Sequence, residues 1–157
     1  MDSVSAGNIV RDTLRTYLTD PYSTAGGDAR DGSYWIFYNE PNIATKFPQI
    51  ELNKIDNPSN PIEIGSNYME DERLFLNIWF YSKNGFKVVV DGTTYINSQL
   101  VEYYLGQIKQ TLKAQFNTMF NQCVKSYKHI NTTRVEYDPD RQLYFGAVTI
   151  HVQYFNR

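Results

Sequence analysis

The sequence predicts an α+β fold in which one long helix packs across an antiparallel, partly mixed β-sheet. Two observations carry this prediction. Up to about residue 97 short runs of strand-forming residues alternate with turn residues, and from about Ser98 to Cys123 apolar residues recur at helical spacing. A short N-terminal helix and a C-terminal β-hairpin complete an element order that is typical of the α+β class.

The first element is a short amphipathic helix. Ser5 or Asn8 is a plausible cap, Asp20-Pro21 is a stop signal, and the apolar residues between them recur at helical spacing: Ile9, Val10, Leu14, Tyr17 and Leu18. The following stretch, YSTAGGDARDG, is rich in Gly, Ser, Thr and Asp and has no recurring apolar residue. We expect it to be an exposed loop.

Strands are expected next. SYWIFYN has aromatic residues on both faces of a short strand, whereas FPQIELNKI alternates and should have one solvated face. IEIGSNYMEDER is expected to bridge to the strand LFLNIWFYSK, with a turn at Gly65. FKVVVDGTTYI places Asp91-Gly92 between two β-prone runs, which predicts a tight hairpin.

The long helix begins after Asn97 or Ser98, either of which can cap it. Gly106 costs it roughly 1 kcal/mol unless a neighbour packs closely there. Its apolar stripe comprises Leu100, Val101, Tyr104, Leu105, Ile108, Leu112, Phe116, Met119 and Phe120. The closing hairpin turns at residues 138–141, where Pro139 suits a type I turn. Its inner face comprises Tyr144, Val148, Ile150, Val152 and Tyr154.

Composition limits the function. With 157 residues we expect one domain, residues 1–157, and a net charge of -2 gives no electrostatic basis for binding a nucleic-acid backbone. The single Cys123 excludes an internal disulfide. We find no signal peptide or membrane-spanning stretch and expect a protein that is cytoplasmic or assembled there.

Catalytic chemistry is not predicted. His129 and His151 lie in separate elements, and the carboxylates of YMEDER are more simply a solvated acidic turn. The Gly-rich GGDARDG lacks the spacing of a dinucleotide or calcium loop. We therefore predict no catalytic, metal or cofactor-binding residues, no cofactor and no enzymatic activity.

The strand LFLNIWFYSK, Leu74 to Lys83, is apolar on both faces. Its even positions, Leu74 to Phe80, are expected to form the core under the long helix, which can cover only one face of a sheet. Either the protein's own chain or a neighbouring subunit must cover the other face. The candidate subunit-interface residues are Phe75, Asn77, Trp79, Tyr81, Trp35 and Phe37.

The order of these segments resembles the tail terminator proteins of tailed phages, which are also called tail-completion or tail-to-head joining proteins. The resemblance spans about Val4 to Phe155 and includes PQIELNKI, IEIGSNYMEDER, LFLNIWFYSK, the long helix after YINSQL and the closing YFGAVTIHVQYF. The most specific part of the resemblance is IEIG followed by an apolar strand that begins after an arginine. The KVVVDGTTYI ribbon departs from the pattern of this family, because it is longer than the minimum such a fold needs. It is either a docking arm or a local elaboration.

The resemblance implies a structural virion protein of the tail or neck, assembled in the host cytoplasm. It implies a homo-oligomeric ring, typically a hexamer, that terminates the tail tube and joins it to the head. The implied partners are other copies of the chain, the major tail tube protein and the head connector or adaptor proteins. DNA would pass through the lumen without sequence-specific binding, and no membrane is involved.

Two alternatives stay open. A head-completion or adaptor protein on the portal side would also form a ring but would differ in its partner. A small α+β ligand-binding domain or enzyme would need polar groups that converge in an apolar pocket between helix and sheet.

Overall fold

The computed structural model describes residues 3–39, 46–55, 60–64, 67–120 and 124–156; the side chains of residues 3–5, 60–64, 67–73, 124–125 and 154–156 lie outside this description. The helices are α1 (Ser3–Tyr17), α2 (Pro21–Thr24), the 3-10 turn η1 (Gly32–Tyr34) and α3 (Ser98–Met119). The strands are β1 (Ile36–Tyr38), β2 (Gln49–Ile55), β3 (Asn60–Ile64), β4 (Asn67–Lys83), β5 (Lys87–Val90), β6 (Thr93–Ile96), β7 (Val124–Thr132), β8 (Glu136–Asp138) and β9 (Leu143–Asn156). This is the predicted α+β class.

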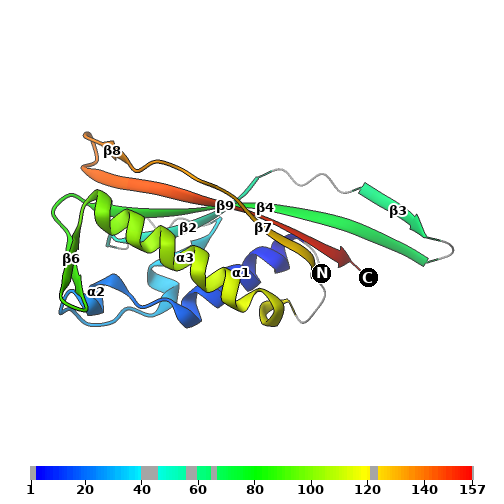
Figure 1. Cartoon of the computed structure of the whole chain (residues 1–157), viewed down its shortest axis with the longest axis horizontal. Helices are drawn as coiled ribbons and strands as arrows, with labels where there is room; N and C mark the ends of the chain where they lie inside the picture. The colour runs from blue at the N-terminus through cyan, green and yellow to red at the C-terminus, as the bar shows by residue number, and fades with distance from the viewer. Residues whose placement is uncertain (1–2, 40–45, 56–59, 65–66, 121–123, 157) are drawn as a thin grey trace.

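The main sheet has the strand order β1-β2-β4-β9-β7, with β3 beside the start of β4 and β8 beside the start of β9. The β1–β2 pairing is parallel and the other pairings are antiparallel, so the sheet is mixed. Strands β5 and β6 form a separate ribbon. Figure 1 shows α1 and α3 on one side of the main sheet and the β5–β6 ribbon at one end of the molecule.

Strand β4 is the longest element of the sheet. It has 17 residues, about 55 Å of extended chain, and pairs with β9 from Glu70↔Asn156 to Lys83↔Leu143. Its first residues pair with β3, from Asn60↔Asp71 to Ile64↔Asn67, and this two-stranded arm extends beyond the helices (Figure 1). The expectation that IEIGSNYMEDER is a linker with an acidic turn was therefore wrong, because most of it is strand; Gly65 lies outside the described residues.

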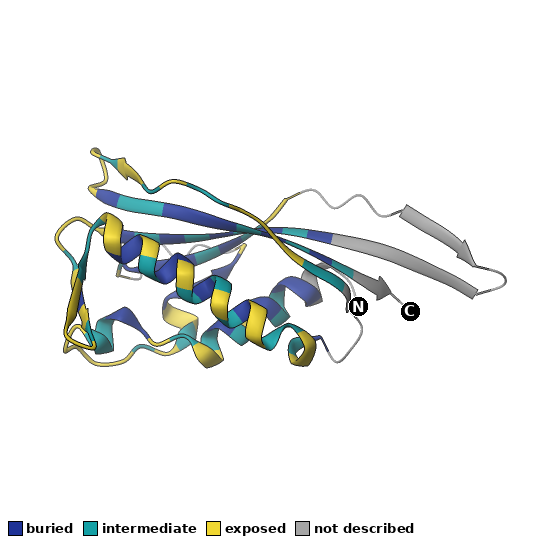
Figure 2. Cartoon of the chain, viewed as in Figure 1, coloured by how far each residue is buried: buried dark blue, intermediate teal, exposed yellow. Residues whose placement is uncertain are grey.

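The core lies between the even face of β4 and the helices, as predicted. Leu74, Leu76, Ile78 and Phe80 are completely buried, and the Phe80 ring stacks on that of Tyr104 of α3 at 4.6 Å between centroids. The stripe of α3 is buried from Leu100 to Leu112 and at Phe120, while Phe116 and Met119 are half-buried. In Figure 2 the outer faces of the helices are exposed and the centre of the sheet is buried.

Helix α3 packs close to the sheet at Gly146 of β9, where the lack of a side chain leaves room for it. A Cβ atom on Gly146 of β9 would lie 2.9 Å from Leu105 Cδ1 and 3.3 Å from Val101 Cγ1, so a larger residue would push the helix outward. At Gly106, in contrast, a Cβ atom would meet nothing within 4 Å, so no close packing offsets the helix cost of about 1 kcal/mol.

Several element boundaries differ from those expected. Helix α1 begins at Ser3, before either expected cap, and Asp20 caps the short helix α2, which begins at Pro21 and overlaps the start of the expected loop. Asn97 precedes α3 with a φ of 53°, but its side chain accepts from Gly85 N–H at 2.9 Å and does not cap the helix. Helix α3 ends at Met119, and Cys123 lies outside the described residues.

The two tight hairpins are where the sequence placed them. Asp91 and Gly92, with φ values of 50° and 79°, join β5 to β6, as Asp-Gly does in hairpin turns. Strands β8 and β9 turn at residues 139–142, where the Asp138 carboxylate accepts from Asp140 N–H at 3.0 Å. Strand β7 was not expected. Within the described residues, no helix is long and apolar enough to span a lipid bilayer.

Candidate subunit interface

The second face of the sheet is formed by the odd-numbered side chains of β4 and β9. The antiparallel register places Phe75 beside His151, Asn77 beside Thr149, and Tyr81 beside Phe145. Because successive strand residues point to opposite faces, these side chains lie on the side away from α3. On this side the long helix cannot cover them.

Aromatic rings dominate this face. Trp79, Tyr81 and Phe145 contact one another, with ring centroids 6.2, 6.1 and 6.0 Å apart, and Phe75 stacks on His151 at 4.4 Å. We call Phe75, Trp79, Tyr81, Phe145 and His151 the aromatic face. All five side chains are half-buried, so the rings shield one another but keep an exposed side.

A polar pair interrupts the aromatic face at its middle. The Thr149 hydroxyl donates to Asn77 Oδ1 at 2.6 Å, and Asn53 of β2 lies beside Asn77 in the register. Glu51 of β2 lies beside Trp79. Half-exposed aromatic rings combined with satisfied polar groups are the usual composition of a protein interface.

Tyr81 shows how far this face is already removed from water. Burial, together with the negative charge of Glu51, raises the pKa of the Tyr81 hydroxyl to about 12, although the cation of Arg141 partly opposes the shift. Phe47 contributes to the same burial, because its ring lies edge-on to Tyr81 at 6.4 Å. The tyrosine therefore stays neutral throughout the physiological range.

The six residues predicted as an interface fall into two groups. Phe75, Asn77, Trp79 and Tyr81 lie together on the aromatic side of β4 and are half-buried. Trp35 is 2% exposed within the chain's own core and Phe37 is 6% exposed, so the same chain already covers both. A second subunit could contact them only at their edges.

Sequence reasoning missed Phe47, Phe145 and His151. Phe145 and His151 occupy odd positions of the strand whose even positions were assigned to the core, so period-two alternation could have placed them on the second face. No sequence signal links Phe47 to Tyr81, because the contact depends on the course of the chain before β2.

The histidines and the described carboxylates show no metal-binding arrangement. His129 lies exposed on β7 with its Nε2 2.8 Å from the Thr132 hydroxyl, and His151 stacks on Phe75. Across the part of the chain that is described, no group of three or more His, Cys, Asp or Glu side chains could hold a metal ion. No protein-family model and no curated protein matches the sequence.

Proposed function

We propose that the chain is a structural protein of a tailed virus, located in the tail or neck. In this proposal several copies form a ring that ends the tail tube and joins it to the head connector, with DNA passing through the lumen. The protein acts through contacts with itself, the major tail tube protein and the connector, and it catalyses no reaction.

The aromatic face is the observation that carries this proposal. Five half-buried rings and an internally satisfied Asn77–Thr149 pair lie on one sheet face, opposite the helices that cover the other. Apolar faces that stay partly exposed favour association because contact with a partner removes the remaining ring surface from water. The order of the elements, which resembles that of tail terminators, supplies the particular kind of assembly.

A head-completion protein on the portal side shares every one of these features. The two roles differ only in the partner, so the same ring serves either. We favour the terminator because the element order that suggested the family is that of terminators.

Localisation in virus particles tests the proposal. Electron microscopy of particles from the virus that encodes the chain should show its density at the junction of tail and head. Particles that lack the protein should accumulate as separate heads and tails, and the gene should lie near those of the major tail and tape-measure proteins. Density in the head shell or at the distal tail tip would refute the terminator role.

A further inference from the structure

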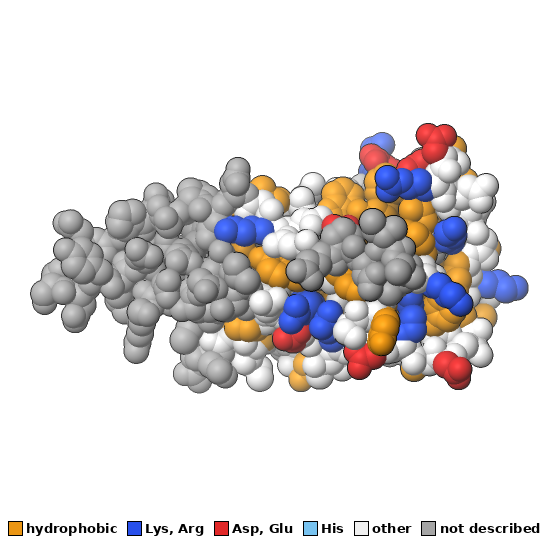
Figure 3. Space-filling model, turned by 180° about the vertical axis from the view of Figure 1, so that it is seen from behind, with side chains coloured by type: hydrophobic (Ala, Val, Ile, Leu, Met, Phe, Trp, Pro, Cys, Tyr) orange, Lys and Arg blue, Asp and Glu red, His pale blue; other side chains and the backbone are white. Residues whose placement is uncertain are grey.

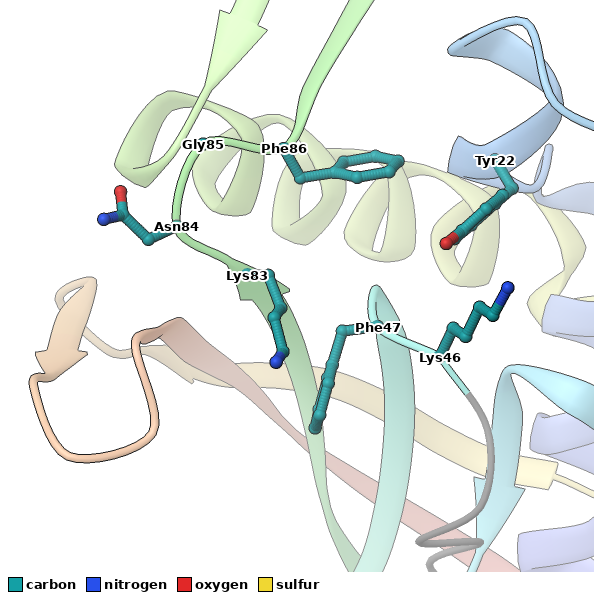
Figure 4. Close-up of a pocket in the computed structure, with 7 residues that line it drawn as sticks. All are labelled: Tyr22, Lys46, Phe47, Lys83, Asn84, Gly85 and Phe86. Carbon is teal, nitrogen blue, oxygen red and sulfur yellow. The ribbon is translucent and has the colours of Figure 1, made fainter.

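An open pocket of about 610 Å³ lies where β4 ends, between α2 and the start of the β5–β6 ribbon (Figure 4). Lys46 and Lys83 contribute ammonium groups to its lining, and Tyr22, Phe47 and Phe86 contribute rings. No acidic residue belongs to the part of the lining that the structure describes. The volume lies in the usual range of small-molecule sites, about 300 to 1,000 Å³. We call this site the basic pocket.

Contacts within the chain hold the three rings of the pocket in place. The ring centroids of Tyr22 and Phe86 are 5.5 Å apart, and the Arg30 guanidinium lies 4.6 Å from the centre of the Tyr22 ring. The Phe47 ring is held by the ring of Tyr81 at 6.4 Å. All three pocket rings are half-buried, so each keeps an exposed part that a ligand can cover. A planar ring suits such surfaces because it can stack on them.

Hydrogen bonds fix the two chain segments that carry the lysines. Arg30, which pairs with the buried Asp20 carboxylate at 2.8 Å, donates to the backbone oxygen of Lys46 at 2.5 Å. The turn after β4 is closed by the Phe86 N–H, which donates to the backbone oxygen of Lys83 at 3.1 Å. The pocket is therefore formed before any ligand binds, which lowers the cost of binding.

The two lysine side chains are available to an anion. Both are exposed, and neither belongs to an ion pair among the described residues. The Asp20 carboxylate is committed to Arg30 and does not neutralise them. In Figure 4 Lys46 and Lys83 lie at different sides of the pocket, and Asn84 points away from it. Figure 3 shows Lys and Arg side chains interspersed with apolar ones at this end of the molecule.

We propose that the basic pocket binds a nucleotide, with the base against the rings and the phosphates at Lys46 and Lys83. A phosphomonoester is a compact group with about -1.5 to -2 charges at pH 7, and lysine binds phosphate as a point charge. The net charge of -2 argues against a grip along a nucleic-acid backbone, but one nucleotide needs positive charge only locally. A free nucleoside triphosphate and the end of a DNA strand both present this chemistry. The site does not depend on the proposed ring.

Isothermal titration calorimetry of the full-length protein with ATP tests the charged half of the site. Lys46→Ala with Lys83→Ala should weaken ATP binding by about tenfold or more, because it removes both charged donors. Lys46→Arg with Lys83→Arg keeps the charge and should retain most of the affinity. The matched control, Lys113→Ala with Lys128→Ala, removes two exposed lysines elsewhere and should bind as the wild type does. Circular dichroism checks that each variant is folded.

The aromatic half of the site is tested with Phe86→Leu. This variant should weaken ATP binding by about fivefold or more, because it removes a ring on which the base stacks. Inorganic tripolyphosphate has the charge of ATP without its base. It should bind more weakly than ATP, and Phe86→Leu should leave its affinity unchanged. A general loss of structure would weaken both ligands, so the comparison separates stacking from misfolding.

A short oligothymidine strand with a 5′-phosphate distinguishes the two sources of the nucleotide. The strand and ATP should compete for the pocket, and both should lose affinity in Lys46→Ala with Lys83→Ala. The ligand that binds more tightly identifies the source, and either result supports the site.

Two sets of results would overturn the proposal. If neither ATP nor the strand binds at millimolar concentration, or if both bind the double alanine variant as tightly as the wild type, the basic pocket is not a nucleotide site. If tripolyphosphate or a decaglutamate peptide binds as tightly as ATP, the pocket recognises charge alone and the assignment of a nucleotide is wrong.

Discussion

At the scale of single residues, the two faces of β4 differ in what completes their packing. The even side chains are fully buried by the same chain, whereas Trp79 and Tyr81 remain half-buried among rings on their own face. Hydrogen bonding follows a similar division. Asn77 and Thr149 satisfy each other on the aromatic side, but the Ser82 hydroxyl is completely buried and has no hydrogen-bond partner among the described residues.

Replacing Ser82 should therefore stabilise the protein. A buried hydroxyl without a partner carries an uncompensated desolvation cost, so Ser82→Ala should raise the free energy of unfolding by roughly 1 kcal/mol. Thr149→Val is the matched comparison and should lower it by about 1 kcal/mol, because it leaves Asn77 Oδ1 without its donor. Urea unfolding measures both, and a loss of stability in Ser82→Ala would contradict the assignment.

The raised pKa of Tyr81 predicts a pH dependence. The folded chain holds the phenol proton up to about pH 12, whereas the unfolded chain releases it near its ordinary value of about 10. The raised pKa stabilises the folded chain fully below about pH 10, and this stabilisation is lost as the pH rises toward 12. Tyr81→Phe should lose less stability than the wild type between about pH 10 and about pH 12. If the wild type and Tyr81→Phe lose stability equally over this range, the pKa of Tyr81 is not raised in the folded chain.

Residue-level prediction from sequence worked where alternation was regular. The even positions of β4 and the stripe of α3 were assigned correctly because burial follows period two in a strand and about 3.6 in a helix. Trp35 was placed with the candidate interface because its strand is aromatic on both faces. Its burial depends on the core cluster that it joins and on Arg30, whose guanidinium lies 5.8 Å from the centre of its ring, and no local pattern encodes either contact.

At the scale of elements, the account depends on β4 having one face for the core and one for a neighbour. Leu76→Asp would place a carboxylate in the core beneath the helices, where an unpaired charge costs several kcal/mol against a total stability of about 5 to 15 kcal/mol. That variant should not fold. Trp79→Asp changes the half-exposed face, so the isolated subunit should stay folded.

Thermal unfolding of the two variants separates these faces. Trp79→Asp should unfold cooperatively at a temperature near that of the wild type, while Leu76→Asp should show no cooperative transition. If Trp79→Asp unfolds the subunit as severely as Leu76→Asp, the aromatic face is covered from within the chain. The second face would then be part of the core and not an interface.

The elements that sequence reasoning missed have two physical causes. Strand β7 has two register shifts, between Val124 and Ser126 and between His129 and Asn131, and such bulges break the alternation by which strands are recognised. The segment IEIGSNYMEDER was expected to be a linker because Gly65 and the clustered carboxylates are turn signals. Most of it is strand because its β3 and β4 residues pair with each other, a contact that local composition does not reveal.

At the scale of the whole molecule, the two ends of the chain's fold differ from each other. The β3–β4 arm extends beyond the helices at one end, and the β5–β6 ribbon lies at the other (Figure 1). A head-to-tail contact between two different surfaces of the same chain, repeated about an axis, closes into a ring. The proposed terminator role requires that geometry.

The mass of the assembled protein tests the central claim most directly. Native mass spectrometry of the full-length wild type and of Trp79→Asp, over a series of protein concentrations, counts the copies in each species. The account predicts that the wild type forms closed oligomers of several copies and that Trp79→Asp stays monomeric but folded, because a central aromatic anchor can contribute roughly 2 kcal/mol or more per contact. A wild-type chain that stays monomeric up to millimolar concentration, or a Trp79→Asp chain that assembles as the wild type does, would contradict it.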